Sequence, residues 1–261
     1  MALNDEVIDA ASFTSIRLIS GIVFLLLLVT VKTKQKINIK GGTWLSAFLL
    51  FIYALAFSYA YLLLDTGTGA LILFASVQVT MIVFGLVKGK TLVLPEWIGL
   101  CIAFIGLIVL LLPGSSTPSL LGFVLMVISG IAWGFYSLAG QGSIDSLNET
   151  ANNFLRTFPF IILLSLFSFD QIQLTNPGIA LAVFSGAITS GLGYAIWYSA
   201  IKELTITNAA IVQLAVPIIA AFGGVIFSNE DISIRLISSS VLVLGGVLLV
   251  MVGKHSTHFD K

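Results

Sequence analysis

The sequence predicts an all-α fold, a polytopic bundle of membrane-spanning helices. Hydrophobic residues make up 58% of the chain and charged residues only 9%, and the mean hydropathy is +1.09. A water-soluble protein of this length would need far more polar surface. The apolar runs approach about 20 residues, twice the length of a barrel strand, and they do not alternate polar with apolar residues.

Nine apolar runs are long enough to cross the hydrocarbon core as helices, in which every backbone amide is paired internally. Short polar, Gly-containing or Pro-containing stretches separate these runs and leave no room for a soluble domain. The first run follows acidic rather than basic residues, so we interpret it as a true span and not as a signal peptide. The expected spans are residues 11–31, 43–64, 69–87, 95–112, 119–140, 151–168, 177–201, 206–228 and 232–252.

The lysines predict the orientation of the bundle. When the spans are threaded through a membrane, all nine lysines fall on one side, and most acidic loop residues fall on the other. By the positive-inside rule the lysine side is cytoplasmic, which places the tail 253–261 inside and residue 1 outside. The lysines are Lys32, Lys34, Lys36, Lys40, Lys88, Lys90, Lys202, Lys254 and Lys261.

An internal repeat relates the two halves of the chain. Adding 139 to a position in the first half reaches a similar position in the second, so that Arg17 pairs with Arg156 and Tyr59 with Tyr198. We assign residues 1–112 and 119–252 to two five-helix repeats, and an odd number of helices makes the second copy inverted, as in many secondary transporters. The helix 119–140 lacks a counterpart, so we expect about 20 further apolar residues to be encoded upstream of Met1; a true nine-span form is the alternative.

Two stretches carry a family resemblance. "YAIWYSAIKELTITNAAIVQLAVPIIAAFGGVIFSNE", residues 194–230, resembles the end of an EamA domain of the drug/metabolite transporter superfamily, and "GIAWGFY", residues 130–136, resembles the opening helix of the second such domain. The first repeat departs from the pattern, with Gln78 in place of Pro217 and Thr91 in place of Glu230. The resemblance implies a cytoplasmic (inner) membrane location and export of amino acids or related compounds.

Two glutamines are candidate substrate-binding residues. Gln78 and Gln213 lie deepest within their spans, where a polar group is costly and is a functional candidate by default. Their amides could donate and accept hydrogen bonds with a substrate in a central cavity. The alternative is that each amide bonds a neighbouring helix.

Aromatic side chains form a second candidate set. Several are spaced three or four residues apart and share a helix face, from which their rings could pack against the apolar part of a metabolite. The candidates are Tyr53, Phe74, Trp133, Tyr136 and Tyr194. Aromatic residues near span ends are better explained by an interfacial belt. These are Trp44, Tyr61, Trp97 and Tyr198.

Five further residues are interpreted as structural or gating. Arg17 and Arg156 are candidates to bind an anionic substrate, but each lies near the start of its span, so we expect the guanidinium to reach the interface along the helix. Gly130 and Gly134 allow two helix backbones to approach closely. Pro217 is expected to kink its helix at mid-span.

The function classes narrow by elimination. Zero net charge gives no indication of a nucleic-acid partner, and the sequence contains no glycine-rich loop that would bind a nucleotide. We expect no cofactor. We also expect no metal, because His255 and His258 have no third ligand. An enzyme would need clustered acids, histidines or a nucleophile with its base. We expect a carrier that moves a small-molecule substrate across the lipid bilayer by rocking one repeat against the other, while a homodimer and a non-transporting structural or regulatory bundle stay open.

The orientation can be tested with single cysteines, in a chain whose one native cysteine, Cys101, has been replaced. Cysteines at Lys36 and Lys90 should resist an impermeant thiol reagent in intact cells, because that side is cytoplasmic, whereas cysteines at Thr117 and Asn229 should react. The reverse labelling pattern would overturn the orientation.

Overall fold

The computed structural model describes residues 7–33, 41–89, 93–111, 118–141, 143–204, 213, 215–228 and 231–256. Each of the nine expected spans contains a described helix, so the all-α membrane fold is confirmed. Five described helical stretches are long and apolar enough to cross a membrane by length and composition. Several residues named for the orientation, the family pattern and the C-terminal histidines lie outside the described ranges: Lys34, Lys36, Lys40, Lys90, Lys261, Thr117, Asn229, Glu230 and His258.

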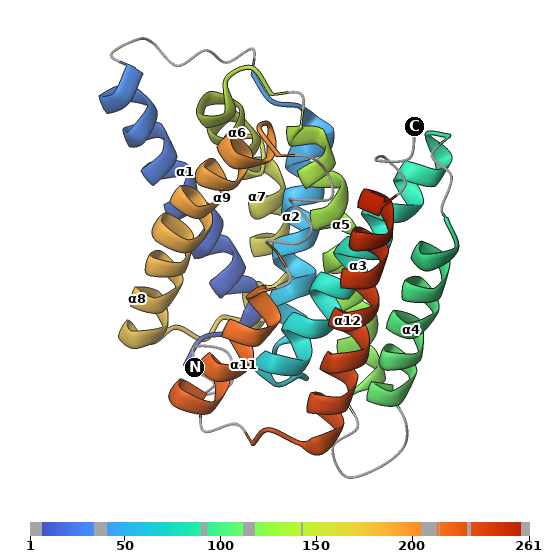
Figure 1. The fold of residues 1–261 in the computed structure, drawn as a ribbon. Helices are drawn as coiled ribbons and strands as arrows, with labels where there is room; N and C mark the ends of the chain where they lie inside the picture. Colours follow the sequence, from blue (N-terminus) through green and yellow to red (C-terminus); the bar gives the residue numbers. More distant parts are fainter. Residues whose placement is uncertain are drawn as a thin grey trace. The chain divides into compact units, whose positions relative to one another are not determined.

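The helices follow the expected spans closely in the first five cases (Figure 1). Their bounds are α1 Ala10–Thr33, α2 Trp44–Ala60, α3 Thr66–Val87, α4 Leu94–Leu111 and α5 Leu120–Gly140. The chain of the sixth and seventh spans forms shorter pieces: α6 Ser146–Leu155, α7 Phe158–Phe167, η1 Phe169–Gln171, α8 Asn176–Phe184, η2 Ser185–Leu192 and α9 Gly193–Ile201. The eighth and ninth spans contain α11 Ala215–Ser228 and α12 Ile234–Ser256.

The chain divides into two compact units that do not coincide with its two sequence halves. Unit 1 comprises residues 1–62 and 135–205, and unit 2 comprises residues 63–134 and 206–261. Unit 1 therefore contains α1, α2 and α6 to α9, and unit 2 contains α3, α4, most of α5, α11 and α12. Each unit takes helices from both predicted repeats.

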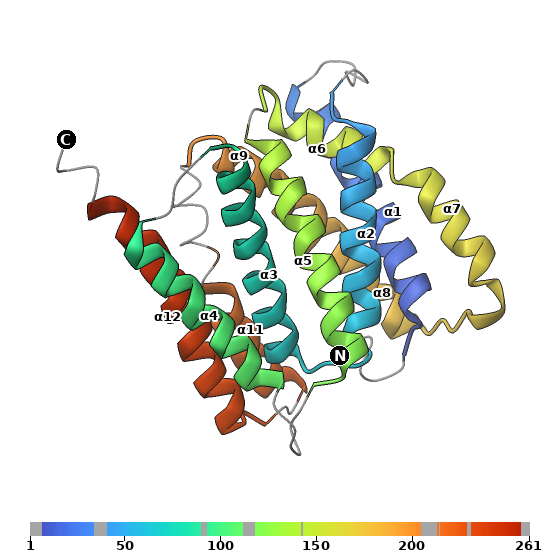
Figure 2. The same ribbon diagram turned by 90° about the vertical axis from the view of Figure 1, so that its right-hand side faces the viewer.

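In unit 1, α1 crosses the segment α8–η2 at very short range, and Figures 1 and 2 show α1 beside α8. Glycines permit the crossing. A Cβ on Gly186 would collide with the backbone oxygen of Arg17 and with the Ser20 hydroxyl, and a Cβ on Gly21 would collide with the Phe154 ring. Small residues at helix contacts are typical of membrane proteins, where apolar burial alone does not bring helices together.

The middle of this long helical stretch is π-helical. Residues Ser185–Leu192 form η2, which continues α8 and leads directly into α9. A π-helical turn shifts the register of the following side chains and occurs frequently at functional sites. Here it places the buried Ser190 against α1.

The sixth span differs from its prediction. It begins at Ser146 rather than residue 151, and it is interrupted at Arg156 and Thr157. Pro159 at the start of α7 explains the break, because proline has no amide to donate to the carbonyl four residues earlier and its ring clashes with that carbonyl. The short α6 is polar yet buried, and several of its polar groups are hydrogen-bonded within the helix: the Asn152 amide donates to the oxygen of Asn148 at 2.8 Å, and the Thr150 hydroxyl donates to the oxygen of Ser146 at 2.7 Å.

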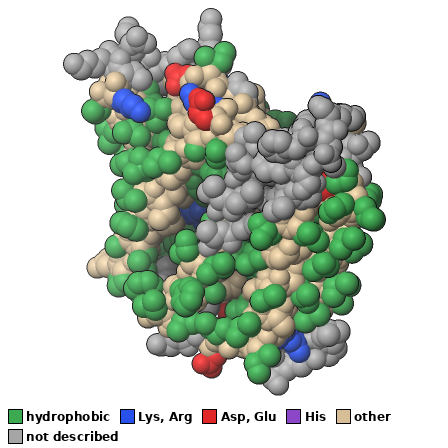
Figure 3. Space-filling model, viewed as in Figure 1, with side chains coloured by type: hydrophobic (Ala, Val, Ile, Leu, Met, Phe, Trp, Pro, Cys, Tyr) green, Lys and Arg blue, Asp and Glu red, His purple; other side chains and the backbone are tan. Residues whose placement is uncertain are grey.

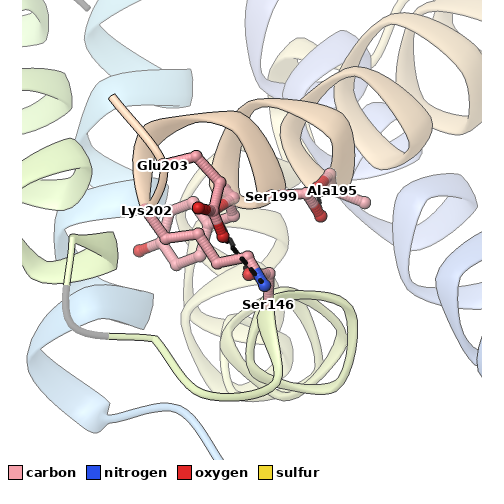
Figure 4. Close-up of polar contacts among 6 residues, drawn as sticks. Ser146, Ala195, Ser199, Lys202 and Glu203 are labelled. Carbon is pink, nitrogen blue, oxygen red and sulfur yellow. Dashed lines mark hydrogen bonds and ion pairs between the residues drawn. The ribbon is translucent and has the colours of Figure 1, made fainter. Parts of the chain in front are cut away.

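The start of α6 lies against the end of α9 (Figure 4). The Ser146 hydroxyl donates to the backbone oxygen of Tyr198 at 3.2 Å, and the Ser199 hydroxyl donates to the oxygen of Ala195 at 2.9 Å. Just beyond α9, Lys202 and Glu203 form an exposed ion pair at 3.9 Å. The Ser146 hydrogen bond therefore joins the start of α6 to the end of α9.

In unit 2, glycines again mark the closest helix contacts, and both ribbon views show α4 beside α12. A Cβ on Gly246 of α12 would lie 2.5 Å from the amide nitrogen of Ala103 and 2.5 Å from the oxygen of Gly99 on α4. On α5, a Cβ on Gly130 would lie 2.5 Å from the Ser76 Cβ of α3, and one on Gly134 would lie 3.0 Å from the Thr80 Cβ. The GIAWG stretch thus lies where the α5 and α3 backbones approach closely.

Hydrophobic side chains cover much of the visible surface of both units (Figure 3). Large apolar side chains are more than half exposed on both, including Leu27 and Ile196 in unit 1 and Phe222 and Val241 in unit 2. Such surfaces suit contact with lipid and would be unfavourable in water. Trp44 and Trp97 are exposed, as an interfacial belt requires, but Tyr198 is fully buried and the belt interpretation is wrong for it.

Two neighbouring glycines of α12 provide a test of this packing. Gly246→Ala should destabilise the purified protein by about 1–3 kcal/mol, because backbone atoms of α4 leave no room for a methyl group. Gly245→Ala is the matched control: its Cβ meets nothing within 4 Å, so the unfolding temperature should stay close to that of the native chain. Equal unfolding temperatures for the two variants would contradict the α4–α12 contact.

Candidate functional site

The most unusual polar residue of unit 1 is Arg17, which is only 5% exposed within α1. Its Nε donates to the Ser190 hydroxyl at 2.7 Å, and its Nη2 donates to the Tyr194 hydroxyl at 2.8 Å. The Tyr194 hydroxyl in turn donates to the Tyr53 hydroxyl at 2.9 Å. A chain of hydroxyl groups from α2, η2 and α9 therefore surrounds the buried guanidinium.

Aromatic rings enclose the rest of this cluster. The Arg17 guanidinium carbon lies 5.0 Å from the centroid of the Phe57 ring and 5.8 Å from that of Tyr53, both within the range of cation–π attraction. Phe154 of α6 contacts Tyr194 at a ring separation of 5.8 Å. We refer to Arg17, Tyr53, Phe57, Ser190 and Tyr194 as the arginine cluster.

The arginine cluster contains no acid. Among the described residues, the Arg17 guanidinium faces the hydroxyls of Ser190 and Tyr194 and the rings of Tyr53 and Phe57. The expectation that Arg17 extends along its helix to the interface is wrong. The prediction failed because the partners of Arg17 on η2 and α9 lie more than 170 residues away in the sequence.

Arg156, the repeat partner of Arg17, is in a different environment. It lies half-buried at the C-terminal cap of α6, not near the start of its span, and its Nη1 donates to the backbone oxygen of Gly41 at 2.6 Å. Nearby, the Asn153 side-chain oxygen accepts from the Thr43 amide at 3.0 Å. Gly42 between them has a φ of 67°, which favours glycine. Arg156 therefore secures the turn before α2.

The predicted aromatic residues separate into different surroundings. Tyr53 and Tyr194 meet in the arginine cluster. Tyr136 is fully buried against Tyr198, at a ring separation of 4.8 Å, and its backbone oxygen accepts from the Tyr198 hydroxyl at 2.9 Å. In unit 2, Trp133 is buried and Phe74 is half-buried.

Sequence reasoning overlooked Ser190 as a site residue. The available signal was the run SGAITSGL, in which small and hydroxyl residues interrupt an otherwise apolar span. Such a run in a membrane helix indicates close packing together with hydrogen bonding to a neighbouring helix.

The two glutamines, both in unit 2, differ in whether their side-chain amides have interaction partners. Gln78 on α3 is 1% exposed and already interacts with other groups of the protein. Gln213 is 4% exposed, and neither its amide nitrogen nor its amide oxygen has a hydrogen-bond partner in the described part of the chain. Most buried polar groups in proteins are hydrogen-bonded, so an amide that lacks a partner at both its nitrogen and its oxygen among the described residues calls for an explanation.

Pro217 is the third residue of α11 and lines an apolar groove of about 590 Å³ between α11 and α12. Apart from Ser240, the groove presents hydrophobic side chains, so it offers few groups for a polar metabolite. The segment before α11, residues 205–212 and 214, lies outside the described ranges. The predicted kink at Pro217 therefore stays a prediction.

Comparison with known proteins identifies the family. The EamA-like transporter family profile matches residues 120–252. An uncharacterized protein of Pseudomonas aeruginosa is 47% identical over 250 residues, which cover 96% of this chain and 87% of that protein. The uncharacterized transporter YoaV of Bacillus subtilis is 21% identical over 91% of this chain and 85% of its own length.

The fold is also found in a solved structure. A crystal structure that is 16% identical in sequence aligns with a TM-score of 0.66, covering 91% of this chain and 87% of that one. An uncharacterized transporter of Archaeoglobus fulgidus adds a match of 26% identity over 82% of this chain and 78% of its own. On the profile match and the 47% identity, the chain belongs to the EamA-like transporter family.

Proposed function

We propose that this membrane transporter exports a small polar organic metabolite, an amino acid or a related compound, by alternating access. The observation that carries the proposal is the amide of Gln213, which is buried in unit 2 and has no hydrogen-bond partner among the described residues. An amide offers two N–H donors and one carbonyl acceptor. Leaving these groups unpaired costs free energy, and a polar substrate would recover that cost on binding.

For Gln78 we favour the alternative role, in which the amide bonds a neighbouring helix instead of the substrate. Because it already has interaction partners, replacing it removes contacts within the protein. The proposal therefore places substrate recognition in unit 2 on Gln213, with Trp133 and Phe74 as further candidates. Gln78 is assigned to packing.

The two compact units suggest which parts move. Alternating access requires bodies that keep their internal packing while they move. The glycine contacts of α1 with η2 and of α4 with α12 each lie within one unit. We therefore propose that the moving bodies are units 1 and 2, rather than the two sequence repeats.

The acidic residues bear on energy coupling. Among the described residues, the acids lie in turns or near helix ends, and the buried Glu96 accepts a hydrogen bond from the Val93 amide at 2.7 Å at the start of α4. A proton-driven carrier usually exposes a titrating carboxylate in its pathway. This placement favours export down a gradient or by exchange.

Gln213→Leu tests the proposal. Transport should fall by roughly 5- to 150-fold, because the substrate would lose a partner worth about 1–3 kcal/mol. Folding stability should be unchanged or slightly higher, since the amide contributes no hydrogen bond among the described residues. The measurement is amino-acid efflux from cells loaded with dipeptides, normalised to the amount of protein in the membrane and compared with cells lacking it.

Gln78→Leu is the matched control, with the same change of side chain at a buried position in the same unit. It should lower the unfolding temperature, because it removes interactions made within the protein, at a cost of about 1 kcal/mol. Normal efflux by Gln213→Leu at normal abundance would remove this residue from the site. A loss of abundance in step with efflux would assign Gln213 to packing.

A further inference from the structure

We propose that the arginine cluster of unit 1 is a carboxylate-binding site, formed by Arg17 with the hydroxyls of Ser190 and Tyr194. The proposal rests on the proposed function in one respect, that the acid bound in unit 1 is a transported compound, and it places no residue of unit 2 at this site. Recognition by a buried arginine narrows the substrate to compounds that carry an organic acid group.

The charge of Arg17 is the first argument. A guanidinium stays charged in proteins, so burial cannot be relieved by losing a proton. Buried charges are normally paired with an opposite charge, but the partners of Arg17 are the neutral hydroxyls of Ser190 and Tyr194 and two aromatic rings. A carboxylate on the ligand would supply the missing negative charge.

The geometry is the second argument. The guanidinium is a planar fork with five N–H donors, and the bonds to Ser190 and Tyr194 use two of them. Phe57 lies 5.0 Å from the guanidinium carbon and holds the side chain by cation–π attraction. A carboxylate matches the edge of such a fork with two parallel hydrogen bonds.

The surroundings favour an acid with an apolar body. Tyr53, Phe57 and Phe154 present aromatic rings around the hydroxyl chain. Aromatic side chains pack well against apolar groups and orient them. An aromatic or aliphatic carboxylic acid therefore fits both parts of the arginine cluster.

A purely structural role fits Arg17 less well than Arg156. Arg156 is half-buried and secures a turn by donating to the Gly41 backbone oxygen, which is a common use of a surface arginine. Arg17 is buried, where the cost of desolvating its charge is large and neutral hydroxyls offset less of it than an anion would. A neutral side chain could join the same helices without that cost.

The test uses the purified full-length chain and two matched pairs of probes: benzoate with benzamide, and L-phenylalanine with L-phenylalaninamide. Within each pair the compounds differ in the acid group and keep nearly the same shape. Thermal unfolding is measured against probe concentration for the native chain, Arg17→Gln, Arg17→Lys and Arg156→Gln. The two pairs distinguish a simple organic acid from an amino acid as the preferred source of the carboxylate.

We expect at least one acid to raise the unfolding temperature of the native chain at concentrations about tenfold or more below those its amide requires. Arg17→Gln should abolish that preference while keeping or raising the unfolding temperature without ligand, because the buried charge is gone. Arg17→Lys should keep part of the preference, since it retains the charge but not the fork. Arg156→Gln should keep the full preference even if its stability falls.

The site is refuted if the native chain shows no acid preference with either pair, or if Arg17→Gln keeps the preference. It is equally refuted if Arg17→Gln fails to fold while Arg17→Lys folds without any acid preference, which would assign Arg17 to structure. Acid-selective binding without amino-acid efflux would keep the site and remove the transport proposal. Amino-acid efflux, together with acid binding that does not depend on Arg17, would keep the transport proposal and remove the site.

Discussion

Inside a bilayer, a polar group can be satisfied only by the protein itself, and this constraint shapes every described helix. Most hydroxyl residues meet it locally. Thr14 donates to the oxygen of Ala10, Ser76 to that of Ile72 and Thr80 to that of Ser76, each one helical turn back at 2.7–2.8 Å. Against this background Arg17 and Gln213 call for an explanation, because the Arg17 charge faces neutral groups and both polar atoms of the Gln213 side chain lack a hydrogen-bond partner among the described residues.

The same constraint makes helix contact depend on shape. Hydrophobic burial does not favour one helix partner over lipid, so close contact relies on small residues and on hydrogen bonds. Gly186 brings α1 onto η2, and that approach places the Ser190 hydroxyl 2.7 Å from the Arg17 Nε. The close packing of α1 against η2 therefore also forms the arginine cluster. A larger residue at position 186 would separate the helices and take Ser190 away from Arg17.

The fold was largely predictable because hydropathy reports helix length directly. The spans follow from the run of apolar residues, and the close approach at Gly130 follows from its spacing to Gly134. The break at Arg156 was less accessible: α6 is polar, and a window of hydropathy assigns such a segment to a loop even when it is a buried helix. Pro159 was the available signal for the interruption.

The candidate site was predictable only in part, because its partners come from distant positions in the chain. Tyr53 and Tyr194 were selected by residue type, yet no sequence pattern showed that they share a hydrogen bond with each other and surround Arg17. Arg17 itself was assigned to the interface by its distance from the start of its span. Burial of a charge depends on which helix lies against it, and that information is tertiary.

An arginine held by hydroxyls suits a carrier better than one held by an acid. A carboxylate from the protein would satisfy Arg17 permanently, and a substrate would have to displace it before binding. Ser190 and Tyr194 instead give the guanidinium neutral partners, so in the proposed site a substrate carboxylate would gain charge pairing without first breaking an ion pair. The same hydroxyls would be available to the guanidinium on release, which would lower its cost. A transporter needs binding strong enough to select its substrate and weak enough to let it go, and neutral partners around a fixed charge meet both requirements.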